Sequence, residues 1–306
     1  MVYAASLSGG FVYEDQREDA GSHLTLTSVS WAIGPRALTS QSYAWTSQWW
    51  DAGPRAARTV SLGWHLLNGL LLWIVARRVL AASAAVCAAG LFLLLPIQTE
   101  AVASIAYRSE LVAATGLLLA LICAARGWIA AAWLCAAGSV LGKEVGIAAL
   151  LLVPLWAWWF GPTWSHGQRW AWGIASLLPF AALVAWFPAH QVSLVRDWAE
   201  AAVAIGAFGR LLAHTAWSVA QAGVLSIDHD WAGIRPEMGA ATLAAWALLW
   251  WVAPAIWRLA LGWLLLALSL RIVLPLPEFH EHHLYTPLIA VSVAVGAMVF
   301  PKGREA

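Results

Sequence analysis

Charged side chains are scarce in this chain. Its 306 residues include 17 Lys and Arg and 16 Asp and Glu, so only 11% are charged, whereas a soluble domain carries about 25%. Hydrophobic residues make up 61% of the chain and the mean hydropathy is +0.71. No stretch of polar sequence is long enough for a separate soluble domain. The composition therefore predicts an integral membrane protein with one membrane domain.

Other absences exclude further classes. The net charge of +1 gives no basic surface, which excludes a nucleic-acid partner. The three cysteines, Cys87, Cys123 and Cys135, lie in apolar runs without metal-ligand spacing, and we interpret them as small buried hydrophobes. Residues 1–13 lack the basic start and apolar core of a signal peptide. A transporter is disfavoured because the chain shows no convincing inverted repeat.

Tryptophan is abundant, and the apolar sequence divides into many segments. Several of the 23 tryptophans lie near segment ends, where indole rings favour the membrane interface. We expect residues 1–58 to form an extracytoplasmic loop with an acidic motif and one or two interfacial helices, and 59–306 to form an all-α polytopic bundle of about 9–10 segments. The predicted spans are 60–76, 79–95, 111–125, 128–141, 145–160, 170–187, 206–225, 240–257, 259–274 and 284–300.

Basic residues in short loops predict the orientation of the bundle. Arg77 and Arg78 separate the first two predicted spans, so this turn should be cytoplasmic and residues 11–58 and 96–110 should face outside. Arg126 and Arg258 also favour the cytoplasm. Because ten crossings would place Arg258 outside, either 128–141 or 206–225 is predicted not to cross.

The first charged cluster is the most concentrated one. Four of the 16 acidic residues, Glu14, Asp15, Glu18 and Asp19, lie within residues 11–19. A carboxylate pair at the edge of a membrane bundle is costly to desolvate, which indicates a function. We therefore predict that Glu14 or Asp15 is the chemical group. The alternative is a solvated N-terminal tail that happens to be acidic.

Further ionisable side chains interrupt the apolar segments. They are Glu100, Arg108, Glu110, Lys143, Glu144, Asp228, Asp230, His280, Glu281, His282 and His283. In a continuous helix, Glu100 and Arg108 would share a face because they are eight residues apart. The structural alternative is that such charges form internal ion pairs that fix helix packing, for example Lys143 with Glu144 or Arg108 with Glu110.

The histidine cluster at 280–283 raises the question of a metal. It fails the HExxH pattern of zinc proteases because position 284 is Leu. A divalent-ion site built from His280, His282 and Asp228 or Asp230 remains an alternative. A phosphate site lined by Arg108 and one or two histidines fits better beside a membrane. We predict no metal and no other cofactor.

Seven short stretches together resemble one family. They are FVYED at 11–15, RALT at 36–39, WHLLN at 64–68, PIQTEAV at 96–102 with RSEL at 108–111, GKE at 142–144, LSIDHD at 225–230 and EHHLYTP at 281–287. In this order they resemble motifs of the GT-C membrane glycosyltransferases related to the transmembrane O-mannosyltransferases that act on cadherins, whose bacterial relatives often carry tetratricopeptide repeats. Each stretch alone is weak, but the series covers nearly the whole chain.

The chain departs from the family pattern at several positions. Leu95 and Gln98 stand where the family has histidines, His282 stands in place of an arginine, and Glu14 in place of an aspartate. Relative to the family, we expect the chain to lack the first helix and the repeats.

The resemblance implies a GT-C bundle in a bacterial inner membrane, with its active face extracytoplasmic. The donor would be a polyprenyl-phosphate sugar reached from the membrane lipid, and the acceptor a hydroxyl of a protein or glycan. Asp15, or else Glu14, would be the general base of an inverting transfer. Arg108, His282 and His283 would bind the donor phosphate. The supporting residues would be Glu100, Glu110, Lys143, Glu144, Asp228, Asp230 and Tyr285.

The alternative function is not enzymatic. The departures and the tryptophan content also fit a catalytically degenerate relative that serves as a structural or accessory subunit beside other membrane subunits.

Overall fold

The computed structural model describes Tyr3, residues 36–50, 53–162, 236–252 and 285–300, and short pieces within 165–175 and 257–263. In these parts of the chain every regular element is a helix and no strand occurs. The prediction of an all-α protein is confirmed to this extent. Two helical stretches, Pro54–Ala76 and Ile105–Ala125, are long and apolar enough to cross a membrane.

Most predicted spans in the described part fall on helices. The α-helices with defined bounds are α2 (Ala37–Trp49), α3 (Pro54–Ala76), α4 (Ala82–Leu94), α5 (Thr99–Ala103), α6 (Arg108–Ala125), α7 (Ile129–Gly142), α8 (Ala148–Phe160), α11 (Pro236–Val252) and α13 (Tyr285–Val299). Helix α3 begins at Pro54, earlier than residue 60, because proline suits the first helical turn. The domain boundary predicted at residue 58 thus falls inside α3. The predicted spans 170–187, 206–225 and 259–274 lie wholly or mostly outside the described residues.

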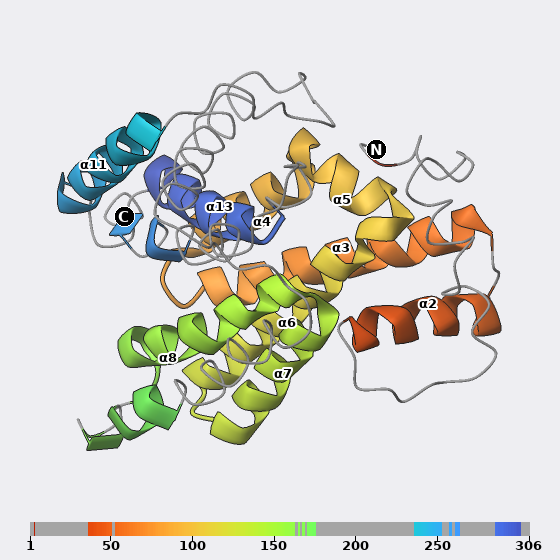
Figure 1. Cartoon of the computed structure of the whole chain (residues 1–306), viewed down its shortest axis with the longest axis horizontal. Helices are drawn as coiled ribbons and strands as arrows, with labels where there is room; N and C mark the ends of the chain where they lie inside the picture. The colour runs from red at the N-terminus through yellow and green to blue at the C-terminus, as the bar shows by residue number, and fades with distance from the viewer. Residues whose placement is uncertain are drawn as a thin grey trace.

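Helix α6 is the centre of the described bundle, where it packs against α3, α7 and α8 (Figure 1). It approaches α7 closely because both helices carry glycine at the contact. A Cβ on Gly116 would lie 2.5 Å from the Ser139 backbone nitrogen, and one on Gly142 would lie 2.8 Å from that of Ala113. Close backbone contact of this kind is typical of helices packed within membranes.

The two arginine-bearing turns lie at the same end of the bundle. Residues 77–81 join α3 to α4, and a turn in which Gly127 has φ 78° joins α6 to α7. Arg108 bonds to the Ala57 carbonyl near the start of α3, and Thr115 bonds to Asn68 further along it. Helices α3 and α6 therefore run in the same direction, and their C-terminal turns, with Arg77, Arg78 and Arg126, share one end.

The stretch between α4 and α6 is broken, which corrects one expectation. Helix α5 ends at Ala103, Ser104 is extended (φ −81°, ψ 129°), and the 3₁₀ turn η3 (Ile105–Tyr107) leads into α6. Arg58 Nε donates to the Ala103 carbonyl at 2.9 Å and so satisfies an acceptor freed at the helix end. Glu100 and Arg108 do not share a face of one continuous helix.

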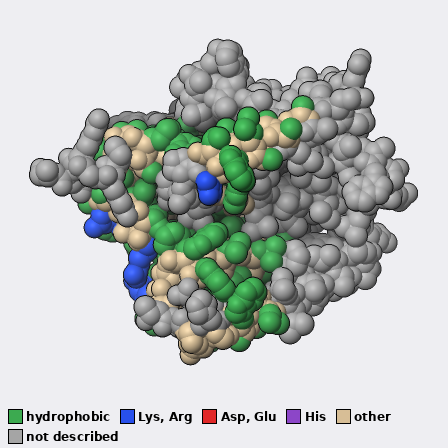
Figure 2. Space-filling view, turned by 90° about the vertical axis from the view of Figure 1, so that its left-hand side faces the viewer, with side chains coloured by type: hydrophobic (Ala, Val, Ile, Leu, Met, Phe, Trp, Pro, Cys, Tyr) green, Lys and Arg blue, Asp and Glu red, His purple; other side chains and the backbone are tan. Residues whose placement is uncertain are grey.

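The outer surface of the described helices is largely apolar. Exposed leucine or tryptophan side chains occur on α2, α3, α4, α7, α8 and α11, and exposed methionine, valine and phenylalanine at the end of α13. Figure 2 shows one face on which hydrophobic side chains are widespread over the described surface, with basic side chains at its left edge and also among the hydrophobic ones. Large exposed apolar areas are rare on soluble monomers and mark contact with lipid or partners.

Candidate functional site

A cluster of polar side chains lies inside the bundle between α3, α6 and α13. Its members are His65, Asn68, Glu110, Thr115, Lys143 and Tyr285, and we call it the interhelical polar cluster. His65, Asn68 and Tyr285 have no exposed surface, and the others are buried as well. Polar groups in an apolar interior are retained where hydrogen bonds compensate their desolvation.

The Tyr285 hydroxyl links α13 to two residues of α3. It lies 2.8 Å from His65 Nδ1 and accepts a hydrogen bond from Asn68 Nδ2 at 3.2 Å. Asn68 also donates to the Leu111 carbonyl at 2.9 Å and accepts from Thr115 Oγ1 at 2.6 Å. The amide of Asn68 is therefore satisfied on both sides, which fixes α3, α6 and α13 in one register.

Both ring nitrogens of His65 lie close to oxygen atoms of this network. Its Nε2 lies 3.3 Å from the Leu93 carbonyl, which can only accept, and this geometry suits a tautomer with the proton on Nε2. In that tautomer Nδ1 accepts from the Tyr285 hydroxyl. Tyr3 closes the other side: its hydroxyl donates to the Leu93 carbonyl at 3.2 Å and lies 3.3 Å from His65 Nε2. A residue near the start of the chain thus reaches the same cluster.

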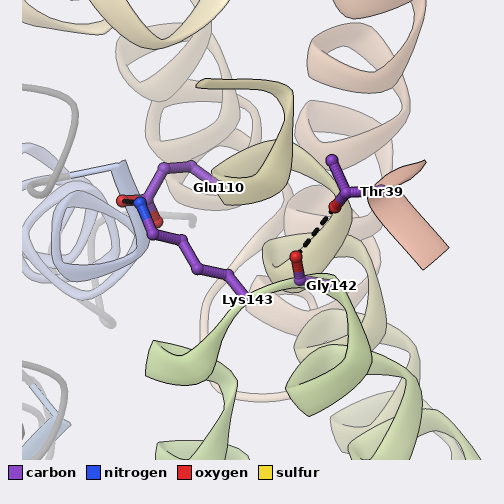
Figure 3. A network of polar contacts seen from close by, with 4 residues as sticks. All are labelled: Thr39, Glu110, Gly142 and Lys143. Carbon is purple, nitrogen blue, oxygen red and sulfur yellow. Dashed lines mark hydrogen bonds and ion pairs between the residues drawn. The ribbon is translucent and has the colours of Figure 1, made fainter. Parts of the chain in front are cut away.

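Glu110 and Lys143 form a buried ion pair between α6 and the end of α7. Lys143 Nζ lies 2.7 Å from Glu110 Oε1, and the two side chains are 6% and 1% exposed. Figure 3 shows them pointing toward each other, next to the Thr39–Gly142 hydrogen bond. Glu110 also interacts electrostatically with Tyr285. Arg108, by contrast, donates to neutral oxygens, which corrects the predicted pairing of Arg108 with Glu110; the predicted pairing of Lys143 with Glu144 involves a side chain outside the described residues.

Arg108 sits next to the cluster and binds neutral oxygens. Nε donates to Ser61 Oγ at 3.2 Å and Nη2 to the Ala57 carbonyl at 2.7 Å, both on α3. Nη1 donates to the carbonyl and hydroxyl of Ser42 at 3.2 and 3.1 Å and to Thr46 Oγ1 at 3.0 Å, all on α2. The guanidinium also lies over the Tyr43 ring, 4.3 Å from its centroid. Arg108 thereby attaches α2 to α3 and α6.

Gln98 is buried, and its side-chain amide nitrogen has no hydrogen-bond partner among the described residues. It occupies the 3₁₀ turn η2 (Pro96–Gln98) and is 1% exposed, and its Nε2 has no hydrogen-bond partner. An unsatisfied buried donor costs about 1–3 kcal/mol.

The structure describes only part of the predicted site. Arg108, Glu110, Lys143 and Tyr285 come together in or beside the interhelical polar cluster, while Glu100 is half-buried on α5. The predicted catalytic residues Asp15 and Glu14 and the residues Asp228, Asp230, His282 and His283 lie outside the described residues, as does the side chain of Glu144. The described part of the chain holds no group of residues suited to a metal ion.

Sequence reasoning did not place His65, Asn68 and Thr115 in the site. His65 and Asn68 interrupt an apolar helix three residues apart, which puts them on one face. That spacing is a usable signal, because polar pairs on one face of a membrane helix are expected to meet partners. Thr115 and the hydroxyls of α2 carry no comparable signal, since serine and threonine are common throughout polar loops and helices.

Comparison of the chain with protein-family models, curated proteins and solved structures finds no match.

Proposed function

We propose that this protein is a GT-C type membrane glycosyltransferase that moves a sugar from a polyprenyl-phosphate donor to a hydroxyl acceptor. The observation that carries the proposal is the convergence of four separate motif stretches. His65 with Asn68, Arg108 with Glu110, Lys143, and Tyr285 come from stretches up to 220 residues apart, yet they meet in and beside one buried cluster. Ionisable residues gathered within a membrane bundle mark functional sites by default.

The orientation of the bundle agrees with this function. The arginine-bearing turns lie at one end, and Arg108, Lys143 and α2 lie toward the other. By the positive-inside rule, Arg77, Arg78 and Arg126 support our assignment of the arginine turns to the cytoplasm and of the polar end to the extracytoplasmic side. A polyprenyl-phosphate donor would approach from the lipid at that end.

The proposed transfer needs one base and one phosphate site. The acceptor oxygen attacks C1 of the sugar, the C1–oxygen bond to the phosphate breaks, and polyprenyl phosphate leaves with inversion at C1. Asp15, with Glu14 as the alternative, takes the proton of the acceptor hydroxyl. Arg108 with His282 and His283 is assigned to the leaving phosphate. In the described conformation Arg108 bonds to protein oxygens, so a phosphate would have to displace hydroxyls of α2.

A structural or accessory role is the second candidate, and a specific observation favours it. Arg108 and Asn68 donate hydrogen bonds to oxygen atoms of the protein itself, and Glu110 and Lys143 form an ion pair with each other. Such a network stabilises helix packing without any ligand.

The test measures transfer by the protein reconstituted in lipid vesicles. Polyprenyl-phosphate mannose and polyprenyl-phosphate glucose with labelled sugars are supplied together with a membrane-protein and glycan extract as acceptor. We expect label to enter the acceptor fraction, and Asp15→Asn to abolish this transfer while the helical circular-dichroism signal is unchanged. Asp19→Asn is the matched control and should transfer at the wild-type rate.

Two results would contradict the proposal. Transfer by Asp15→Asn at the wild-type rate would remove the assigned base. If the wild-type protein transfers neither sugar but purifies in fixed stoichiometry with other membrane proteins, the accessory role replaces the enzymatic one.

A further inference from the structure

Helix α2 has its polar side toward the bundle. Thr39, Ser42 and Thr46 are buried. Thr39 Oγ1 donates to the Gly142 carbonyl at 2.8 Å, and the other two accept hydrogen bonds from Arg108. A surface helix of a soluble protein has the reverse arrangement, with its apolar side toward the core. Helix α2 therefore buries three hydroxyls on the side that meets the bundle.

The adjacent face of α2 carries a stripe of large apolar side chains. Leu38, Trp45 and Trp49 follow one another at spacings of seven and four residues, which places them on one face. They are 42%, 53% and 82% exposed, and Trp50 at the helix end is 62% exposed. The rings of Trp45 and Trp49 are stacked, with centroids 6.2 Å apart. We call these four residues the tryptophan stripe. Helix α2 itself contains no charged residue.

The stripe lies where a candidate membrane span begins. Trp50 lies four residues before Pro54, where α3 begins, and Arg108 bonds to both Thr46 of α2 and Ala57 of α3 (Figure 1). Less than half of the most apolar part of α3, 44%, is buried in the protein. The remaining apolar surface of α3 is stable only in contact with a nonpolar medium. The tryptophan stripe lies beside this surface, so the same medium contacts it.

We propose that the tryptophan stripe of α2 is a lipid-binding surface that lies at the boundary of headgroups and acyl chains beside the N-terminal end of α3. Indole rings favour this boundary because it offers an apolar layer for the ring and hydrogen-bond acceptors for its N–H group. Arg108 fixes the helix from its polar side, so the stripe is held against the bilayer. This surface does not depend on the proposed transferase activity.

The test places a fluorescent label on the stripe and measures its quenching in vesicles. The background has all three cysteines replaced by alanine. An environment-sensitive fluorophore is attached to Trp45→Cys, Trp49→Cys or Trp50→Cys. Ser47→Cys is the matched control, because residue 47 lies on the opposite side of α2 and is only half-buried. Leu134→Cys on α7, where the native side chain is 74% exposed, gives a reference for the apolar surface.

The stripe labels should be quenched by lipids that carry a doxyl group near the headgroup. We expect this quenching to exceed that at residue 47 by about twofold, and to exceed quenching by a doxyl group at the acyl-chain end. Iodide in the water should quench the stripe labels less than the doxyl lipids do.

Three results would overturn the proposal. In the first, iodide quenches the stripe labels more strongly than doxyl lipids do, which means that the stripe faces water. In the second, labels on separate protein molecules show energy transfer in place of lipid quenching, which means that a second copy covers the stripe. In the third, doxyl lipids quench the labels at residues 45 and 47 equally, which means that the stripe has no preference for lipid.

Discussion

The buried Glu110–Lys143 pair makes the sharpest prediction about stability. Its atoms are 2.7 Å apart and both side chains are almost fully buried, so neither charge can be solvated by water if its partner is removed. Breaking a buried pair from one side typically costs about 3–5 kcal/mol. We therefore expect Glu110→Gln and Lys143→Met each to lower the free energy of unfolding by about 3–5 kcal/mol.

The double variant separates this pair from its surroundings. With Glu110→Gln and Lys143→Met combined, no charge is left unpaired, so the loss should be smaller than the sum of the two single losses by about 2 kcal/mol or more. The measurement is equilibrium unfolding in detergent micelles, followed by circular dichroism. Glu144→Gln is the comparison variant at the sequence neighbour of Lys143. We expect it to cost less than Glu110→Gln, whose carboxylate lies 2.7 Å from Lys143 Nζ.

Two independent surface residues would behave differently from a buried pair. Single losses below about 1 kcal/mol that add up in the double variant would have the size expected of exposed pairs. A larger loss for Glu144→Gln than for Glu110→Gln would assign Lys143 to its sequence neighbour instead.

Three further predictions concern the helix contacts. Tyr285→Phe removes the hydroxyl that joins α13 to α3 and should cost about 1–3 kcal/mol in the same unfolding assay, because it leaves buried groups unsatisfied. Gly116→Ala should lower the free energy of unfolding by about 1–3 kcal/mol, since its Cβ would meet the backbone of α7. Gly63, which has open space around it, should tolerate alanine or become more stable by up to about 1 kcal/mol. Equal effects of the two substitutions would contradict the close packing of α6 and α7. Arg108→Lys keeps the charge but loses the fork that binds α2, so hydrogen exchange in α2 should become faster than in α7; unchanged exchange would show that α2 is held by other contacts.

Sequence reasoning reached the helices but not their contacts. Apolar runs predicted most described helices within a few residues, because burial in lipid or protein requires continuous apolar sequence. It could not predict the break at Ser104, since residues 99–107 contain neither proline nor glycine and a bond from Arg58 helps to stabilise the break. The pairing of Lys143 with Glu110 could not be predicted either. Side chains of adjacent residues point in different directions, whereas side chains from neighbouring helices can meet.

The amino-acid sequence by itself determined an all-helical, charge-poor protein with apolar segments and a small set of isolated ionisable residues. Those properties are local, since they depend on composition and on periodicity along one chain. Only the tertiary structure decided that α3 and α6 run in the same direction, that residues of distant stretches meet in one polar cluster, and that α2 turns its hydroxyls inward and its tryptophans outward. Contacts between residues far apart in sequence are fixed by packing and hydrogen bonding, which composition and periodicity do not specify.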